Sequence, residues 1–114
     1  IFPPGFPQTI EALLMGMSWA FNRKAAGDAR AIIQFHVSGV EAGAYYLQIA
    51  NGKCESKEGL TPTPDLRIHT PDTVWMRIVH KELDGAQALQ DGLYQVEGDW
   101  SLLLKMNEWF AQTP

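Results

Sequence analysis

The chain has 114 residues, 46% of them hydrophobic and 19% charged, and its formal net charge at pH 7 is −4. This length suits a single globular domain, and the composition excludes an intrinsically disordered chain. Acidic and basic residues are scattered, so no basic stripe is present to bind nucleic acid or an anionic membrane surface. The longest apolar stretch, residues 12–21, covers about half the length that a membrane-spanning helix needs.

The N-terminal segment, residues 1–8, contains three prolines and one glycine. This composition predicts a linker or a trimmed terminus, followed by one domain over residues 9–114. The segment has no basic region of the kind that begins a secretory signal peptide. Cys54 is the only cysteine, which excludes an internal disulfide bond. Together these features favour a cytoplasmic location.

A helix is predicted over residues 10–22. Thr9 can cap it, because a threonine oxygen accepts the free backbone N–H groups of a first helical turn. One side carries apolar residues at helical spacing, as in a helix that packs on a core: Ile10, Leu13, Leu14, Met17 and Phe21. Met15 and Trp19 lie on the opposite side, where a surface helix would carry charges. The sequence therefore predicts a second apolar face at Met15 and Trp19.

The following residues alternate apolar and polar side chains with the period of two that is typical of β-strands. This pattern predicts strands over residues 31–38 and 44–50. Asn51-Gly52 then predicts a tight hairpin, because both central residues of a type I′ turn need a positive φ. Residues 53–58 are polar on both faces apart from Cys54, so we expect an exposed edge strand. Further short strands are predicted over residues 65–69 and 93–97.

Three helices are predicted in the C-terminal half. Thr70-Pro71-Asp72 indicates a helix start, with a capping hydroxyl, a proline at the first helical position and an acid near the positive end of the dipole. Asp84 is expected to begin a short helix that stops at Gly92. Asp99 is expected to cap the final helix.

The final helix is apolar over most of its circumference. Its polar residues form one narrow arc: Ser101, Lys105, Glu108 and Gln112. Apolar residues fill most of the rest: Trp100, Leu102, Leu103, Leu104, Met106, Trp109 and Phe110. This arc is about twice the width that a helix packed on a sheet requires. We therefore expect its surplus to contact another helix, a partner chain or a ligand.

No catalytic or metal-binding motif is present. His36, His69 and His80 are the only histidines, and no pair of them has the spacing of metal ligands. His36 and His69 alternate with apolar residues on predicted strands, and His80 lies near a helix end, where we expect it to face solvent. Cys54 has no neighbouring group that would activate it as a nucleophile. We therefore expect no enzyme, no cofactor and no metal site.

Five aspartates could suggest paired carboxylates for acid–base chemistry: Asp65, Asp72, Asp84, Asp91 and Asp99. Each lies at a predicted turn or helix start, where a carboxylate oxygen can accept backbone N–H bonds. We interpret them as structural caps.

Methionines and tryptophans gather on the predicted helices, in excess of what one small core needs. We predict an apolar slot between one sheet face and the helices. Its lining residues are predicted to be Phe35, Trp75, Met76, Val79, Leu102, Met106 and Phe110. Arg67, Arg77 and Lys105 are weaker candidates for gripping a charged head group, so head-group selectivity is expected to be loose.

From residue 22 to 110 the chain resembles the sterol carrier protein-2 (SCP-2-like) sterol-transfer domain. The matching stretches are Gly27-Asp28, residues 32–35, residues 46–49, Asn51-Gly52-Lys53-Cys54, residues 64–68, residues 70–75, residues 92–99 and residues 102–106. No single stretch is diagnostic, but their order and spacing extend over most of the chain.

The resemblance implies an α+β fold, with a five-stranded, mostly antiparallel sheet covered by helices and an apolar cavity between them. It implies a long-chain ligand such as a fatty acid, a fatty acyl-CoA or a sterol, and no catalytic residues. It also implies that the domain occurs alone or at the end of a larger enzyme.

Two alternatives to a stand-alone carrier stay open. The apolar helix faces could form a homodimer or interdomain interface without any ligand. The domain could also be an accessory to a larger enzyme, and the proline-rich segment over residues 1–8 favours that arrangement.

Overall fold

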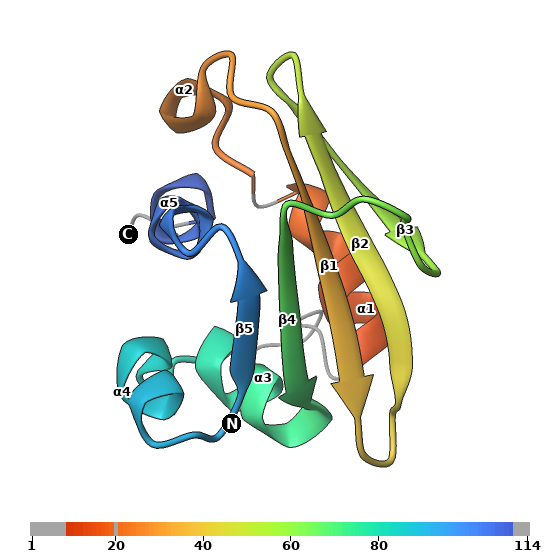
Figure 1. The fold of residues 1–114 in the computed structure, drawn as a ribbon, viewed down its shortest axis with the longest axis vertical. Helices are drawn as coiled ribbons and strands as arrows, with labels where there is room; N and C mark the ends of the chain where they lie inside the picture. Colours follow the sequence, from red (N-terminus) through yellow and green to blue (C-terminus); the bar gives the residue numbers. More distant parts are fainter. Residues whose placement is uncertain (1–8, 20, 111–114) are drawn as a thin grey trace.

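The computed structural model describes residues 9–19 and 21–110 (Figure 1), so the predicted linker over residues 1–8 lies outside the described part. The elements in chain order are α1 (Ile10–Gly16), the short 3₁₀ helix η1 (Met17–Trp19), α2 (Arg23–Ala26), β1 (Ala31–Ser38), β2 (Gly43–Ala50), β3 (Lys53–Glu58), β4 (Leu66–Pro71), α3 (Asp72–Val79), α4 (Gly85–Gln90), β5 (Gln95–Gly98) and α5 (Ser101–Trp109).

The strands form one five-stranded sheet in the order β3-β2-β1-β4-β5. β1 pairs in parallel with β4, and the other three pairs are antiparallel. The predicted α+β fold with a mostly antiparallel sheet is therefore confirmed. The Asn51-Gly52 hairpin is also confirmed, because both residues have positive φ, 54° and 73°.

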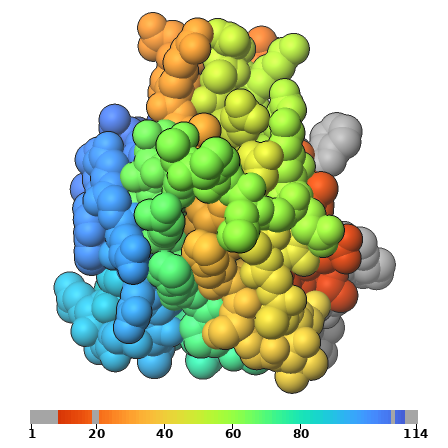
Figure 2. Space-filling model, turned by 45° about the vertical axis from the view of Figure 1, so that its right-hand side comes forward, coloured from red at the N-terminus to blue at the C-terminus, as the bar shows by residue number. Residues whose placement is uncertain are grey.

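The helices lie on one face of the sheet. In Figure 1, α1 and α3 lie behind the strands, and α5 lies beside β5. Alternate strand residues point to this side and are almost completely buried: Ile33, Phe35, Leu47, Ile49, Leu66 and Ile68. The helices contribute Ile10, Leu14, Trp75, Leu102 and Met106 to the same core. On the other face, parts of β1, β2 and β4 (orange, yellow and green) reach the surface in Figure 2.

The parallel β1–β4 pair requires a connection across the sheet, which residues 59–65 provide. In Figure 1 this segment runs in front of β1 and β2. Beneath it, the Gln34 side chain is 1% exposed although it points away from the apolar core. Its Nε2 donates to the carbonyl oxygens of Tyr45 (2.9 Å) and Gly59 (3.0 Å), and its Oε1 accepts from the Thr61 backbone N–H (2.8 Å). Gln34 therefore ties the crossing segment to the sheet.

The first helix is shorter than predicted. α1 ends at Gly16, and the chain passes through η1 before a new helix, α2, begins after Asn22. Asn22 begins a helix and does not end one, because its Oδ1 accepts from the backbone N–H groups of Lys24 and Ala25. Asparagine competes for backbone hydrogen bonds inside helices and is favoured at their N-caps.

The predicted helix start, with Thr70 as the cap and Pro71 as the first helical residue, is wrong by one residue, because α3 begins at Asp72. Both belong to β4, where Pro71 still pairs with Ser38 of β1. The Thr70 hydroxyl donates to the Pro71 carbonyl oxygen at 2.9 Å, and no side chain caps α3. Strand pairing with β1 therefore overrides the local helix signal.

The aspartates act as acceptors, as predicted. Asp65 accepts from the Ile32 backbone N–H, Asp84 from that of Gln87 and Asp99 from that of Ser101. Asp91 differs, since it accepts from the Gln87 side-chain amide at 3.0 Å.

Candidate functional site

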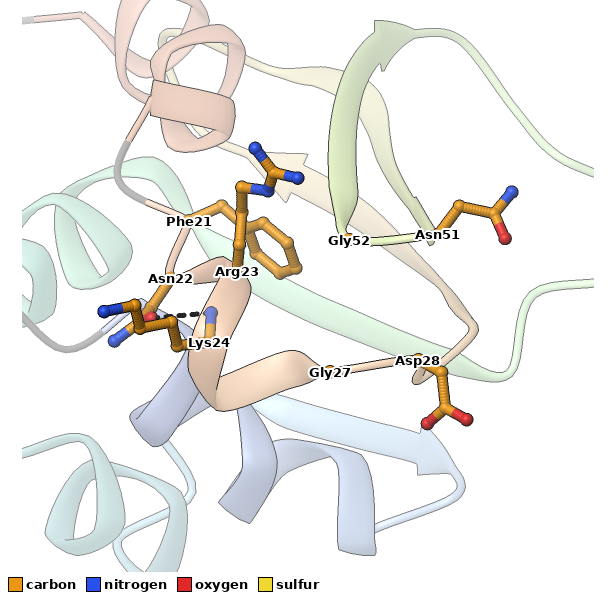
Figure 3. A pocket seen from close by; sticks show the side chains of 8 residues that line it. All are labelled: Phe21, Asn22, Arg23, Lys24, Gly27, Asp28, Asn51 and Gly52. Carbon is orange, nitrogen blue, oxygen red and sulfur yellow. Dashed lines mark hydrogen bonds between the residues drawn. The ribbon is translucent and has the colours of Figure 1, made fainter.

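A hollow of about 930 Å³ opens between α2 and the β2–β3 hairpin (Figure 3). We call it the α2–hairpin hollow. Its lining residues are Phe21, Asn22, Arg23, Lys24, Gly27, Asp28, Asn51 and Gly52. None of them belongs to the slot predicted from the sequence, so the structure adds an opening that sequence reasoning missed.

A helix cap at Asn22 and chain turns at Gly27 and Gly52 shape this hollow. Asn22 caps the first turn of α2, so that the short helix projects Arg23 and Lys24 as exposed side chains. Gly27 turns the chain towards β1 with a φ of 60°. On the opposite side, Gly52 turns the hairpin with a φ of 73° and lies against Arg23, since a Cβ added there would be in ordinary contact with Arg23 Nε at 3.7 Å.

The rim of the hollow is cationic. Arg23 and Lys24 carry two positive charges and Asp28 one negative charge, which leaves +1 in a chain whose net charge is −4. In Figure 3 the Arg23 guanidinium points towards the hairpin, and the Asp28 carboxylate points away from it. The Lys24 side chain points to the other side of α2, so the Arg23 guanidinium is the cation that faces the hairpin, and it suits a carboxylate, sulfate or phosphate group.

Phe21 connects the hollow to the core. Its ring centroid lies 6.4 Å from that of Trp109 and 5.6 Å from that of Phe110. Trp109 is 2% exposed and belongs to the same core cluster as Leu102 and Met106. The Asn22 backbone N–H donates to the Trp109 carbonyl oxygen at 2.6 Å, which joins the start of α2 to the end of α5. The one aromatic side chain that lines the hollow therefore also packs against the end of α5.

The structure brings the predicted slot residues into one packed interior. Phe35, Trp75, Leu102 and Met106 are buried core residues. Met76, Val79 and Phe110 are half-buried and pack against that core. The Trp75 ring makes edge contacts with Phe35 at 5.1 Å and with Tyr94 at 5.9 Å. Side chains of the slot therefore contact one another, and a ligand would enter by displacing them.

The residues predicted more weakly to contact a head group, and Met15 of the predicted second apolar face, lie away from the hollow. Arg67, Arg77 and Lys105 are exposed and none of them lines the hollow. Met15 is 39% exposed on α1. The Trp19 side chain lies outside the described part of the structure, so the second apolar face stays a prediction.

Sequence reasoning missed Phe21, Arg23 and Lys24 because it placed all of residues 10–22 on one helix. The signal that could have separated them was Asn22 followed by two cations, since asparagine is a preferred N-cap and marks a new helix start.

His36 and His69 lie side by side on the helix-free face, because the parallel register pairs them. Their rings stack with centroids 4.6 Å apart and planes at 8°. Burial, together with the charges of His69 and Arg67, lowers the His36 pKa from 6.5, and Glu97 opposes this shift. The nitrogen lone pairs of an imidazole lie in the plane of its ring. The lone pairs of the two stacked rings therefore lie in parallel planes and do not point at one shared position. Among the described residues, no group of three or more possible ligands could hold a metal ion.

His80 and Cys54 are both largely shielded from solvent. The expected exposure of His80 is wrong, because its side chain is only 3% exposed. Burial, with a smaller contribution from Glu55, raises the pKa of the Cys54 thiol to about 12. The thiol is therefore protonated at neutral pH and a poor nucleophile.

Fold and hollow together define a class of small α+β domain, in which one sheet face and its helices enclose an apolar interior. A model of the SCP-2 sterol transfer family matches residues 12–111, and the chain belongs to this family. The family resemblance drawn from the sequence is confirmed, and membership makes the chain a lipid-binding module. In the described residues no helix is long and apolar enough to cross a membrane.

Solved structures share the fold. Sterol carrier protein 2 like 2 from Aedes aegypti is 18% identical, with a TM-score of 0.69 over 87% of this chain and 91% of that one. Its palmitated form, solved by NMR, is 16% identical, with a TM-score of 0.71 over 92% and 96% of the two chains. A search of the curated proteins found no match.

A double mutant of the sec-alkyl sulfatase PisA1 also contains this fold. It is 15% identical, with a TM-score of 0.83 over 93% of this chain. The chain corresponds to only 17% of that enzyme's length. The same fold therefore occurs as a small protein and as a part of a larger enzyme.

Proposed function

We propose that residues 9–114 form a carrier domain for a long-chain amphiphile with an anionic head group, such as a fatty acid or a fatty acyl-CoA. The observation that supports this most is the α2–hairpin hollow, with cations on its rim and Phe21 leading to the core aromatics Trp109 and Phe110. The palmitated relative from Aedes aegypti is consistent with a fatty acyl ligand.

The driving force would be removal of the ligand's apolar part from water. Each buried methylene contributes about 0.8 kcal/mol, so ten would contribute about 8 kcal/mol before the entropy cost of association. Methionines line the proposed path at Met76 and Met106, and their flexible side chains adapt to ligands of different shape. The anionic head group would also be attracted to Arg23 and Lys24 on the rim of the α2–hairpin hollow.

The first test is native mass spectrometry of the gently purified protein, followed by titration with a fluorescent long-chain fatty acid. We expect a co-purifying lipid or saturable binding that unlabelled fatty acid displaces. A clean protein mass without saturable binding would contradict the carrier function.

A matched pair of variants on α5 tests the location of the slot. Phe110→Glu places a charge beside Phe21 and is expected to abolish fatty acid binding. Leu104→Glu changes a residue that is 71% exposed on the same helix and is expected to leave binding unchanged. Binding that survives Phe110→Glu in a folded protein would place the slot elsewhere.

A second candidate function is docking to a neighbouring domain or a second copy. Trp100, at the start of α5, is 53% exposed and Leu104 is 71% exposed, so the described part of the chain leaves some of the wide apolar arc uncovered. The occurrence of the fold within a larger sulfatase supports an accessory role. Light scattering decides on self-association: a dimer that Leu104→Glu dissociates would favour docking, and a concentration-independent monomer would exclude self-association.

A further inference from the structure

Three buried polar side-chain atoms in the described part of the chain have no hydrogen-bond partner: Ser56 Oγ, His69 Nε2 and Trp75 Nε1. His69 Nε2 lies 3.6 Å from a Glu97 carboxylate oxygen, so a small movement would satisfy it. Ser56 lies on the edge strand β3, and its hydroxyl can rotate. Trp75 differs from both, because a rigid indole presents its N–H in one fixed direction.

Among the described residues the Trp75 N–H makes no hydrogen bond. Trp75 is 6% exposed, and its ring contacts Phe35, which has no polar side-chain atom, and Tyr94. The Tyr94 hydroxyl donates to the Gly85 carbonyl oxygen at 2.9 Å. A buried indole N–H usually has a partner, and leaving it unpaired is costly. This N–H is therefore a donor available to a bound molecule.

Trp75 packs on Phe35 of β1, four residues along the strand from Ala31, and the rim residues Gly27 and Asp28 precede that end of the strand. Four residues of a strand span roughly 13 Å, so the indole lies about that far along β1 from the end where the hollow opens.

We propose, on the basis of the proposed function above, that Trp75 Nε1 donates a hydrogen bond to an oxygen in the buried part of the ligand. The ligand class is then an anionic amphiphile with a second oxygen, as a ketone, hydroxyl or ether, in the buried part of its chain. A site built to hydrogen-bond a ligand oxygen discriminates against the analogue that lacks it, because the buried donor is then left unpaired.

The test compares octadecanoate with octadecanoates that carry a ketone at successive mid-chain positions. A ketone oxygen accepts a hydrogen bond and cannot donate one, so it reports on the indole N–H alone. Wild-type protein is expected to bind the best-placed ketone about tenfold more tightly than octadecanoate. Trp75→Phe keeps an aromatic ring and removes the donor, so it is expected to lose the preference and to bind the best-placed ketone no more tightly than octadecanoate.

A second readout does not depend on the variant's affinity. The indole N–H resonance of Trp75 is expected to shift downfield in the NMR spectrum when the ketone ligand is added, and to stay in place with octadecanoate. Octadecanoate binding without a preference for any ketone, or a preference that Trp75→Phe retains, would overturn the inference and leave the carrier function intact. Failure of wild type to bind any of these ligands would overturn both.

Discussion

The Asp72 carboxylate accepts the backbone N–H of Glu41 at 2.8 Å and thereby joins the first turn of α3 to the turn between β1 and β2. The other oxygen accepts the Thr73 N–H at 2.7 Å. Glu41 extends the connection, because its Oε1 accepts the Ile10 N–H at the start of α1 at 3.0 Å. Two helices are thus anchored to one tight turn at the lower end of the sheet.

Gly39 is required at this turn. Its φ is 106°, and an added Cβ would lie 2.5 Å from Asp72 Oδ1. Gly39→Ala is therefore expected to destabilise the fold by about 2 kcal/mol or more, measured by urea unfolding. Gly16→Ala is the control, because nothing lies within 4 Å of the added Cβ. Equal stability of the two variants would show that the turn relaxes without cost.

Gln34→Ala should detach the segment that crosses the sheet. The variant leaves the Thr61 N–H and the Gly59 carbonyl oxygen without their partner. We expect a loss of about 1–3 kcal/mol and faster hydrogen exchange of the Thr61 amide. Gln48→Ala, at an exposed position on β2, is the control. Unchanged exchange at Thr61 would mean that the segment is held by other contacts.

The His36 pKa predicts how stability depends on pH. Burial and the nearby positive charges lower this pKa in the folded state, so the unfolded chain takes up the proton more readily. The stabilising contribution is complete above pH 6.5 and is lost as pH falls from 6.5 through the lower folded-state pKa. His36→Gln should flatten thermal stability over this window, as measured by calorimetry at several pH values. An unchanged profile in the variant would assign the effect to other groups.

Cys54 is expected to react slowly with iodoacetamide. A thiol pKa of about 12 leaves almost no thiolate at pH 8. We expect alkylation at least about tenfold slower than in the urea-unfolded chain, followed by mass spectrometry. Equal rates in the folded and unfolded states would show that β3 opens freely.

Charge reversal tests the head-group interaction. Arg23→Glu with Lys24→Glu is expected to weaken fatty acid binding by about tenfold and to leave the binding of an uncharged fatty alcohol unchanged. Lys57→Glu with Lys81→Glu is the matched control, since both lysines are exposed and neither lines the hollow. Equal losses in the two double variants would indicate an effect of net charge alone.

The sequence predicts the strands well because their alternation reflects burial on one face. Residues 31–38 form β1 as expected, and the turn chemistry of Asn51-Gly52 sets the β2–β3 register. The parallel pairing of β1 with β4 depends on contacts between residues distant in the chain. For this reason the sequence alone could not bring His36 beside His69.

The site was predicted less completely than the fold. Apolar periodicity identified Phe35, Trp75 and Met106 as interior residues, which the structure places in the core. Periodicity does not reveal where a helix ends, however, and the structure ends α1 at Gly16 and begins α2, which lines the hollow, at Arg23. In the sequence, Arg23 and Lys24 cannot be distinguished from other surface cations, because only the folded hairpin places an opening beside them.

The order of strands in the sheet has a consequence for how the chain folds. β1, β2 and β3 pair with their neighbours in sequence, whereas β4 must return past two strands to reach β1. Since local pairings form with a smaller loss of chain entropy, we expect the three-stranded meander to form early and β4, β5 and α5 to dock later. The end of α5 then meets Asn22 in the closing steps, so the rim of the hollow would be among the last parts of the molecule to form.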